Sequence, residues 1–457
     1  MSEDLAVDIN FDIIRRDIIV GNRAAALFFI DGFTKDEVYE KMMEFLFKRK
    51  PEDLESLNTM EQFSRLYMPY IEVAFETDIN EIETAVLSGQ SALLIDGISG
   101  ALLVDTREYP VRAVKEPEKD KSLRGSRDGF VETLIFNTAM IRRRIRDPKL
   151  RMEYIRVGKR SKVDLAVVYV DGTADERVVK KLKRKLSELD INNISMTAQA
   201  LSETLVKTNY FNPFPKIKFT ERPDYASACI LEGRVALVMD NSPSVMLFAT
   251  SFADFTKEVD DYYFPPVTGT FVRTVRIFVS LSTVFLTPAV LLFLNNPSYL
   301  PHWLKFLTDY SETPISIFAQ FLIIEFIIDA LRLASMNTPS ALSNSLGIIG
   351  GLLLSDFAIQ AGWFIPEAII YMSFVAIASF AQPSFEMGYA MKFGRLILLV
   401  LTQLLGLWGF IAGTVLIILV MTFSKTLSGR GYFYPILPFN AKDFMKMFVR
   451  TKIKKGH

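Results

Sequence analysis

Cysteine and histidine are almost absent from this chain of 457 residues. The single cysteine, Cys229, cannot form an intramolecular disulfide, which fits a reducing compartment. The two histidines, His302 and His457, cannot supply a histidine-rich metal site. The sequence also lacks a P-loop, a GxSxG elbow and a usable cysteine–histidine pair. We therefore expect no enzyme, no metal and no other cofactor.

An excess of either charge is missing as well. The chain has 52 Lys and Arg residues and 52 Asp and Glu residues, so its formal net charge at pH 7 is zero. No general field attracts a polyanion, and nucleic acid is not an expected partner. The first residues, MSEDLAVD, are acidic where a secretory signal would be basic and then apolar. We expect the first hydrophobic span to act as an uncleaved insertion signal, which leaves the preceding part in the cytoplasm.

Long runs without charge are present, and they lie in the last part of the chain. Residues 277–294 and 396–423 contain no Asp, Glu, Lys or Arg. As helices they would be about 27 Å and about 42 Å long, against a hydrocarbon core of about 30 Å. The second run must therefore tilt strongly or break near Gly406 to Gly409. The sequence predicts that this part is embedded in a membrane.

The apolar stretch Ile315 to Leu333 is unusual because it carries charges. Glu325, Asp329 and Arg332 share a narrow sector of one helix face at about 100° per residue, and Arg332 is spaced to pair with Asp329. Each charge at the bilayer centre costs on the order of 3 kcal/mol, so these side chains should face protein or water. Asp356, in the next apolar stretch, is a further candidate. Two interpretations stay open: an ion-pair network that joins helices, or the lining of a path for ions or solutes.

The order of these segments predicts the domain organisation and the topology. Gly409 and Gly413 have the GxxxG spacing that lets helix backbones approach closely. The tail from Lys442 is basic and amphipathic, and such tails stay cytoplasmic, so the number of crossings should be even, with four or six favoured. We expect α/β subdomains at 1–150 and 151–270, a transmembrane helical domain at 271–435 and a basic cytoplasmic tail at 436–457.

The part before the membrane spans contains an internal repeat. An apolar run that ends at Asp-Gly is typical of a strand followed by a turn. We therefore expect two related α/β subdomains in tandem, a hairpin at Ala92 to Asp105, and turn roles rather than catalytic roles for Asp31, Asp96 and Asp171. The segments that we match are 28–32 with 168–172, 92–97 with 228–233, and 101–105 with 236–240.

A dense cationic run, IRRRIR at Ile141 to Arg146, lies between the two copies. One interpretation is a patch that binds anions or lipid headgroups. The favoured interpretation is a solvated helix face paired with nearby acids such as Glu116, Glu118 and Asp128, in which the arginines also tie one subdomain to the next.

Several long segments together resemble the GerA family, the A-type subunits of bacterial spore germinant receptors and their relatives. They run from NFDIIRRDI at Asn10 through EPEKDKSLRGSRDGFVETLIFN, NPFPKIKFTERPDYASACILEGRVALVMDNSP and DDYYFPP to YFYPILPFN. The stretches RGSRDGFVE and TERPD are long and unusual, and the resemblance covers almost the whole chain.

The resemblance implies a protein of the spore inner membrane that acts in germination, with other spore germination membrane proteins as partners. It also implies a homo-oligomer, since family members are thought to form ring-shaped ion channels, and it brings no catalytic motif. Glu325, Asp329, Arg332 and Asp356 become candidates for a pore or an intramembrane polar network. We expect an oligomeric channel-like subunit in contact with membrane lipid. The alternative is a non-conducting, membrane-anchored scaffold or receptor subunit that organises germination proteins.

Overall fold

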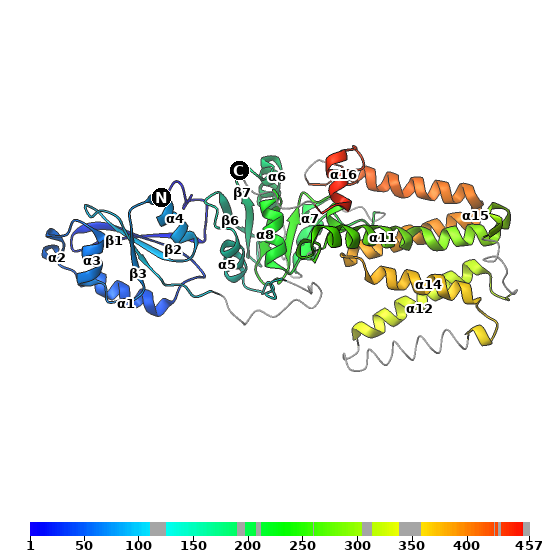
Figure 1. Ribbon diagram of the computed structural model, residues 1–457, viewed down its shortest axis with the longest axis horizontal. Coiled ribbons are helices and arrows are strands. Elements are labelled where there is room, and N and C mark those ends of the chain that lie inside the picture. Colours follow the sequence, from blue (N-terminus) through cyan, green and yellow to red (C-terminus); the bar gives the residue numbers. More distant parts are fainter. Residues whose placement is uncertain are drawn as a thin grey trace. The chain divides into compact units, whose positions relative to one another are not determined.

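The computed structural model describes most of the chain, and these residues form two compact units (Figure 1). The first unit comprises Met1–Thr208, Lys216–Thr250 and Thr426–Arg430, and the second comprises Asn209–Pro215, Ser251–Lys425 and Gly431–His457. The described residues are 1–109, 125–189, 197–206, 212–258, 260–303, 313–337, 358–424, 426–427 and 431–450.

The first unit contains two antiparallel sheets of five strands each. Their strand orders are β1-β2-β4-β5-β3 and β6-β7-β9-β10-β8. When the strands of each sheet are numbered in chain order, the two sheets therefore have the same strand order. A tandem repeat predicts this shared topology. The strands are β1 Ile13–Val20, β2 Arg23–Ile30, β3 Val73–Glu76, β4 Ser91–Ile95, β5 Ala101–Val104, β6 Leu150–Val157, β7 Val163–Val170, β8 Lys218–Thr220, β9 Val235–Met239 and β10 Val245–Phe248.

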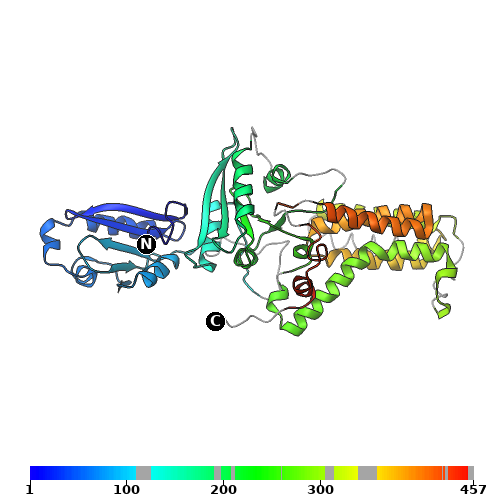
Figure 2. The same ribbon diagram turned by 90° about the horizontal axis from the view of Figure 1, so that it is seen from above.

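Helices cover both faces of each sheet (Figure 2). The inner strands are consequently mostly apolar, and β9, VALVM, is buried at every position. In the first sheet, α1 and α3 pack on one face and α4 packs on the other. In the second sheet, α6 and α7 pack on one face, and α5 and α8 on the other. The helices are α1 Asp36–Phe47, α2 Pro51–Glu55, α3 Met60–Tyr67, α4 Ile79–Leu87, α5 Leu134–Arg144, α6 Glu176–Ser187, α7 Thr197–Leu205 and α8 Pro223–Leu231.

The register of the repeat differs from the sequence prediction at two of its three matches. Residues 92–97 contain strand β4, but residues 228–233 are the end of helix α8. The true counterpart of β4 is β9, and that of β5 is β10. The prediction was wrong because a short apolar run before a glycine has the same appearance in a helix and in a strand. The hairpin prediction is confirmed, since β4 pairs with β5.

The cationic run covers the end of α5, and only part of it is a solvated face, since Arg143 and Arg146 are exposed whereas Arg142 is not. Glu116 and Glu118 lie outside the described residues. Arg142 is fully buried and donates from Nε and Nη2 to Asp12, which directly precedes β1, at 2.8 and 2.9 Å. Its Nη1 donates to the carbonyl of Leu150 at the start of β6. Arg142 thus ties the two subdomains together, whereas Arg144 pairs with Asp128 as expected.

The two unusual sequence stretches meet in the first unit. Arg222 of TERPD donates to the carbonyl of Ser126 at 3.0 Å, and the amide of Phe130 donates to the carbonyl of Glu221 at 2.8 Å. Because Ser126 and Phe130 belong to RGSRDGFVE, segments far apart in the sequence form one structural element.

A short segment that follows the last long helix belongs to the first unit. Leu427 is 6% exposed and packs with the core of the second sheet, and its carbonyl accepts from Lys181 Nζ of α6 at 3.1 Å. The second unit receives a segment in return, because Phe214 packs with Phe255 and Tyr432 in its core. The chain therefore passes between the units several times.

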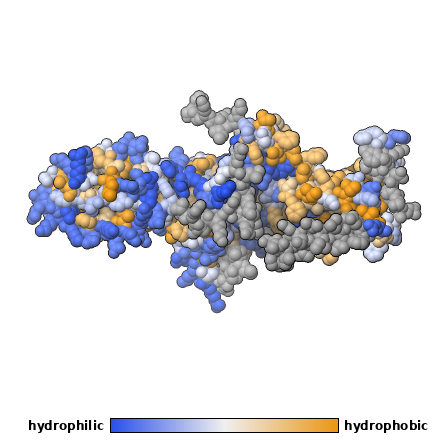
Figure 3. Space-filling view, turned by 60° about the horizontal axis from the view of Figure 1, so that its bottom comes forward, coloured by the Kyte–Doolittle hydropathy of each residue, from blue (hydrophilic) through white to orange (hydrophobic). Residues whose placement is uncertain are grey.

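The second unit is helical, and its longest described helices are α11 and α15. By length and composition, these two are the described helices apolar enough to cross a membrane. Apolar side chains cover much of this unit's visible surface (Figure 3). The helices are α9 Phe252–Phe255, α10 Asp260–Tyr263, α11 Pro266–Asn295, α12 Ile317–Asn337, α14 Pro366–Phe380, α15 Phe385–Phe423 and α16 Ala441–Phe448, with a 3-10 turn, η1, at Pro297–Tyr299.

Helix α15 breaks at Gly406, which is one of the two alternatives, a strong tilt or a break, that the length of its apolar run left open. Gly406 has φ 57° and ψ −132°, a conformation that favours glycine. The second half returns along the first, because a Cβ at Gly409 would lie 1.8 Å from the carbonyl oxygen of Leu401, and one at Gly413 would lie 2.6 Å from the Leu398 side chain. The GxxxG pair therefore permits the close approach in this helical hairpin.

Candidate functional site

The three charged residues predicted on one helix face all lie on α12 and project to its packed side. The Glu325 side chain is 8% exposed and that of Asp329 is 34% exposed. Asp356 lies outside the described residues. In the part of the chain that the structure describes, no group of three His, Cys, Asp or Glu side chains could hold a metal.

The partners of the two carboxylates come from α15. Arg395 Nη2 donates to both oxygens of Glu325 at 2.7 and 2.6 Å, and Lys392 Nζ lies 3.2 Å from Glu325 Oε1. Lys392 also pairs with Asp329. The Arg395 side chain is 4% exposed and that of Lys392 is 11% exposed, so the Glu325 pairs are shielded from solvent, whereas the Lys392–Asp329 pair is only partly shielded. Asp329 therefore pairs across helices with Lys392, in place of the pairing with Arg332 that the sequence spacing suggested.

Arg332 is held by α14 and by aromatic rings. Its Nη2 donates to Ser379 Oγ at 2.9 Å, and its guanidinium lies 4.9 Å from the ring centre of Phe380 and 5.6 Å from that of Tyr389. Cation–π contacts of this kind stabilise a cation in an apolar setting.

Helix α11 completes the site. Arg395 Nη1 donates to the carbonyl of Thr283 at 2.7 Å, and Gln382 Nε2 donates to the Thr283 hydroxyl at 3.0 Å. Four helices therefore converge on one polar network inside an apolar bundle: α11, α12, α14 and α15. Each polar contact satisfies a hydrogen-bonding group that the surrounding apolar side chains could not satisfy.

The network surrounds a cavity of about 20 Å³, which is room for about one water molecule. Among the described residues, Arg332 Nε, Gln382 Oε1 and Arg395 Nε are buried without a hydrogen-bond partner, and all three residues line this cavity. The charged groups around it include three cations and two carboxylates. The site thus offers two donors, one acceptor and a positive balance of charge to a small polar occupant.

Sequence reasoning found the α12 side of this network and missed the α15 side. A signal was available: Lys392 and Arg395 are three residues apart, directly before the uncharged run, so they share a helix face. The two carboxylates on α12, Glu325 and Asp329, are four residues apart, a spacing that also places them on one helix face. The polar residues Ser379 and Gln382 had no comparable signal.

The model of the family "Bacillus/Clostridium GerA spore germination protein" matches residues 2–457 of the chain. The chain belongs to the GerA family. Stage V sporulation protein AF of Bacillus subtilis (strain 168) is 35% identical over 445 residues, covering 97% of this chain and 89% of that protein. Spore germination protein A1 of the same organism is 30% identical over 388 residues, covering 83% of this chain and 80% of that protein.

Within the GerA family, residues 379–399, SFAQPSFEMGYAMKFGRLILL, and the preceding IPEAIIYM predict the stage V AF type, with which the 35% identity agrees. These residues include Ser379, Gln382, Lys392 and Arg395 of the polar network. Among solved structures, the N-terminal domain of the A subunit of the Bacillus megaterium spore germinant receptor GerK3 is 28% identical, with a TM-score of 0.41. The match covers 54% of this chain and 90% of the solved chain.

Proposed function

We propose that this GerA family member is an oligomeric, ion-channel-like subunit of the spore inner membrane that promotes ion release during germination. The observation that supports this most is the polar network, because a helix bundle that served only as an anchor would not need five charged side chains at bilayer depth. In this proposal α11, α12, α14 and both halves of α15 are embedded in the membrane. The α/β unit lies in the cytoplasm.

The geometry suggests which network residues would face the ions. Glu325 and Arg395 are deeply buried and pair with each other, so they hold the helices. Asp329 is about one-third exposed and lies at the edge of the network, where a path along α12 or between copies would pass. The enclosed cavity has room for about one water molecule, so conduction requires the network to open or neighbouring copies to contribute.

Ion flux from vesicles tests this proposal. The full chain and its germination partners are reconstituted in liposomes loaded with potassium, and Asp329→Asn is compared with the unchanged chain. We expect flux to fall at least about tenfold in Asp329→Asn, since a carboxylate that is partly shielded from water stabilises a passing cation by more than about 1.4 kcal/mol. The matched control is Glu386→Gln, an exposed carboxylate in the first turn of α15. Equal flux in the chain and in Asp329→Asn would remove Asp329 from the mechanism.

A scaffold remains the second candidate, and one observation favours it: both described carboxylates of the network already have cationic partners within one chain. In that case the network only locks helices together. Replacing the helical unit with an unrelated anchor, while keeping residues 426–430, should then preserve germination. Loss of germination despite normal assembly would count against the scaffold.

A further inference from the structure

Helix α16 has two apolar faces, and its own chain covers one of them. Phe444, Met447 and Phe448 pack into the core of the helical unit. The other face exposes Met445 at 56% and Val449 at 36%. These two positions are four residues apart, so they lie on one side of the helix.

Two lysines border the exposed face. Lys442 and Lys446 are both exposed and lie within about 100° of Met445 around the helix. Directly before the helix, Leu437 is 44% exposed and Phe439 is 66% exposed. An apolar centre bordered by lysines on flexible stems is typical of a helix that lies in the interface of a bilayer.

The attachment of α16 fixes it at the start of an apolar helix. Arg273 Nη1 donates to the carbonyl of Lys446 at 2.9 Å, and the amide of Arg450 donates to Thr270 Oγ1 at 3.1 Å. The uncharged part of α11 begins at Ile277, about 6 Å further along the axis than Arg273. Helix α16 therefore lies at the level where α11 would enter hydrocarbon.

The two lysines at this face differ in whether an acidic side chain of the same helix pairs with them. Lys446 pairs with Asp443 at 2.9 Å, and this lysine, together with the Tyr434 hydroxyl, lowers the pKa of Asp443. Asp443 is thus ionised at neutral pH and offsets part of the Lys446 charge. Lys442 has no ion pair with any residue that the structure describes, so its charge is available to an anionic group.

We propose that the outer face of α16, formed by Lys442, Met445, Lys446 and Val449, together with the exposed Leu437 and Phe439 just before the helix, binds anionic phospholipid, with Lys442 as the main headgroup contact. The apolar side chains would enter the acyl boundary while the lysines contact phosphate. This inference rests on the membrane location in the proposed function, and it goes beyond it by naming a lipid class and a site.

Lipid retention in nanodiscs tests this inference. The full chain is placed in nanodiscs of phosphatidylcholine mixed with phosphatidylglycerol, extracted gently, and analysed by native mass spectrometry for the lipid that it retains. We expect Lys442→Gln to lower the ratio of retained phosphatidylglycerol to phosphatidylcholine about fivefold. Lys446→Gln should lower it less because Asp443 shares its charge, and Lys442→Arg should preserve it. Met445→Ser should lower retention of both lipids without changing their ratio.

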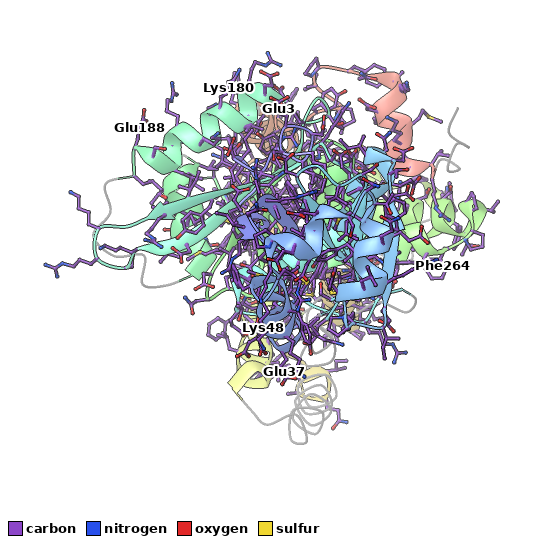
Figure 4. The ribbon with its side chains drawn as sticks, turned by 90° about the vertical axis from the view of Figure 1, so that its left-hand side faces the viewer. Glu3, Glu37, Lys48, Lys180, Glu188 and Phe264 are labelled. Atoms are coloured by element: carbon purple, nitrogen blue, oxygen red, sulfur yellow. The ribbon has the colours of Figure 1, made fainter. Side chains whose placement is uncertain are left out.

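The matched control is Lys180→Gln on α6. Lys180 also pairs with an acid on its own helix, Glu176, at 2.8 Å, and it projects outward from the α/β unit (Figure 4). This variant should retain the unchanged ratio. If the double variant Lys442→Gln/Lys446→Gln still co-elutes with the nanodisc and retains the two lipids in an unaltered ratio, the proposed lipid site is wrong. A chain that does not co-elute would instead contradict the membrane location itself.

Discussion

Each unit of this molecule buries an arginine with a carboxylate, but the two pairs end differently. In the α/β unit, Arg142 uses Nε and Nη2 for Asp12 and Nη1 for a carbonyl. In the helical unit, Arg395 uses Nη2 for Glu325 and Nη1 for a carbonyl, while its Nε has no partner among the described residues and faces a cavity.

The Arg142 pair is an isolated ion pair, whereas the Arg395 pair is part of an extended ion-pair network. The Arg142 pair is complete in itself and joins two subdomains. The Arg395 pair continues through Lys392 to Asp329, which is partly exposed. Because hydrocarbon offers no hydrogen bonds, such an extended network is costly to keep incomplete. The closed pair fits a purely structural role, whereas the extended one allows charge to be rearranged.

The largest effect is expected from Glu325→Gln, which removes the carboxylate of the buried pair in the helical unit. It leaves the buried Arg395 without its carboxylate partner, and an uncompensated buried charge costs about 3–5 kcal/mol. Thermal unfolding in detergent should detect this through tryptophan emission, since Trp303, Trp363 and Trp408 all lie in the helical unit. Asp443→Asn, outside the network, should unfold nearly like the unchanged chain. Equal unfolding of Glu325→Gln and the unchanged chain would show that the network is not structurally important.

A smaller effect is expected from Asp12→Asn in the α/β unit. The amide oxygen still accepts one hydrogen bond from Arg142, so the loss should be about 2–3 kcal/mol. Hydrogen exchange followed by mass spectrometry should show faster exchange in β1 and β6 and no change in α12. The control is Asp17→Asn, since Asp17 forms an exposed pair with Arg15. Faster exchange in both variants alike would mean that the junction does not depend on the buried pair.

The smallest effect is expected at the surface. Hydrogen bonds from the Tyr154 hydroxyl and from Arg156 lower the pKa of Asp164 below 3.8. Its contribution, at most about 1 kcal/mol for an exposed pair, is present above pH 3.8 and is lost as the pH falls through the lower folded pKa. Denaturation of the unchanged chain and of Asp164→Asn should therefore differ slightly at pH 7 and converge in acid. A gap that widens in acid would contradict this assignment.

The fold was predictable where its pattern is periodic and long. The repeat and the hairpin of β4 and β5 followed from apolar runs and glycines, and the break of α15 at Gly406 was one of two alternatives that the length of its apolar run left open. The register of the repeat was not predictable in the same way, because ACILEG has the composition of a strand and yet ends α8. Its helical state depends on packing against the second sheet, which no local pattern records.

The site was predictable only from the residues of α12. Glu325 and Asp329 are conspicuous because they interrupt an apolar run, whereas Lys392 and Arg395 stand at the edge of one. Which cation meets which carboxylate depends on the packing of α12 against its neighbours, and this is a tertiary property. The burial of Arg142 was hidden for the same reason: its partner is 130 positions away.

The place of Leu427 has a consequence for biosynthesis. This residue completes the core of the second sheet, but the ribosome adds it only after α11 to α15 have been made. The core of the second sheet is therefore completed only after the strands of the α/β unit have been translated. Its last apolar contact forms when the chain has been synthesised beyond α15, which gives the maturation of the two units an order.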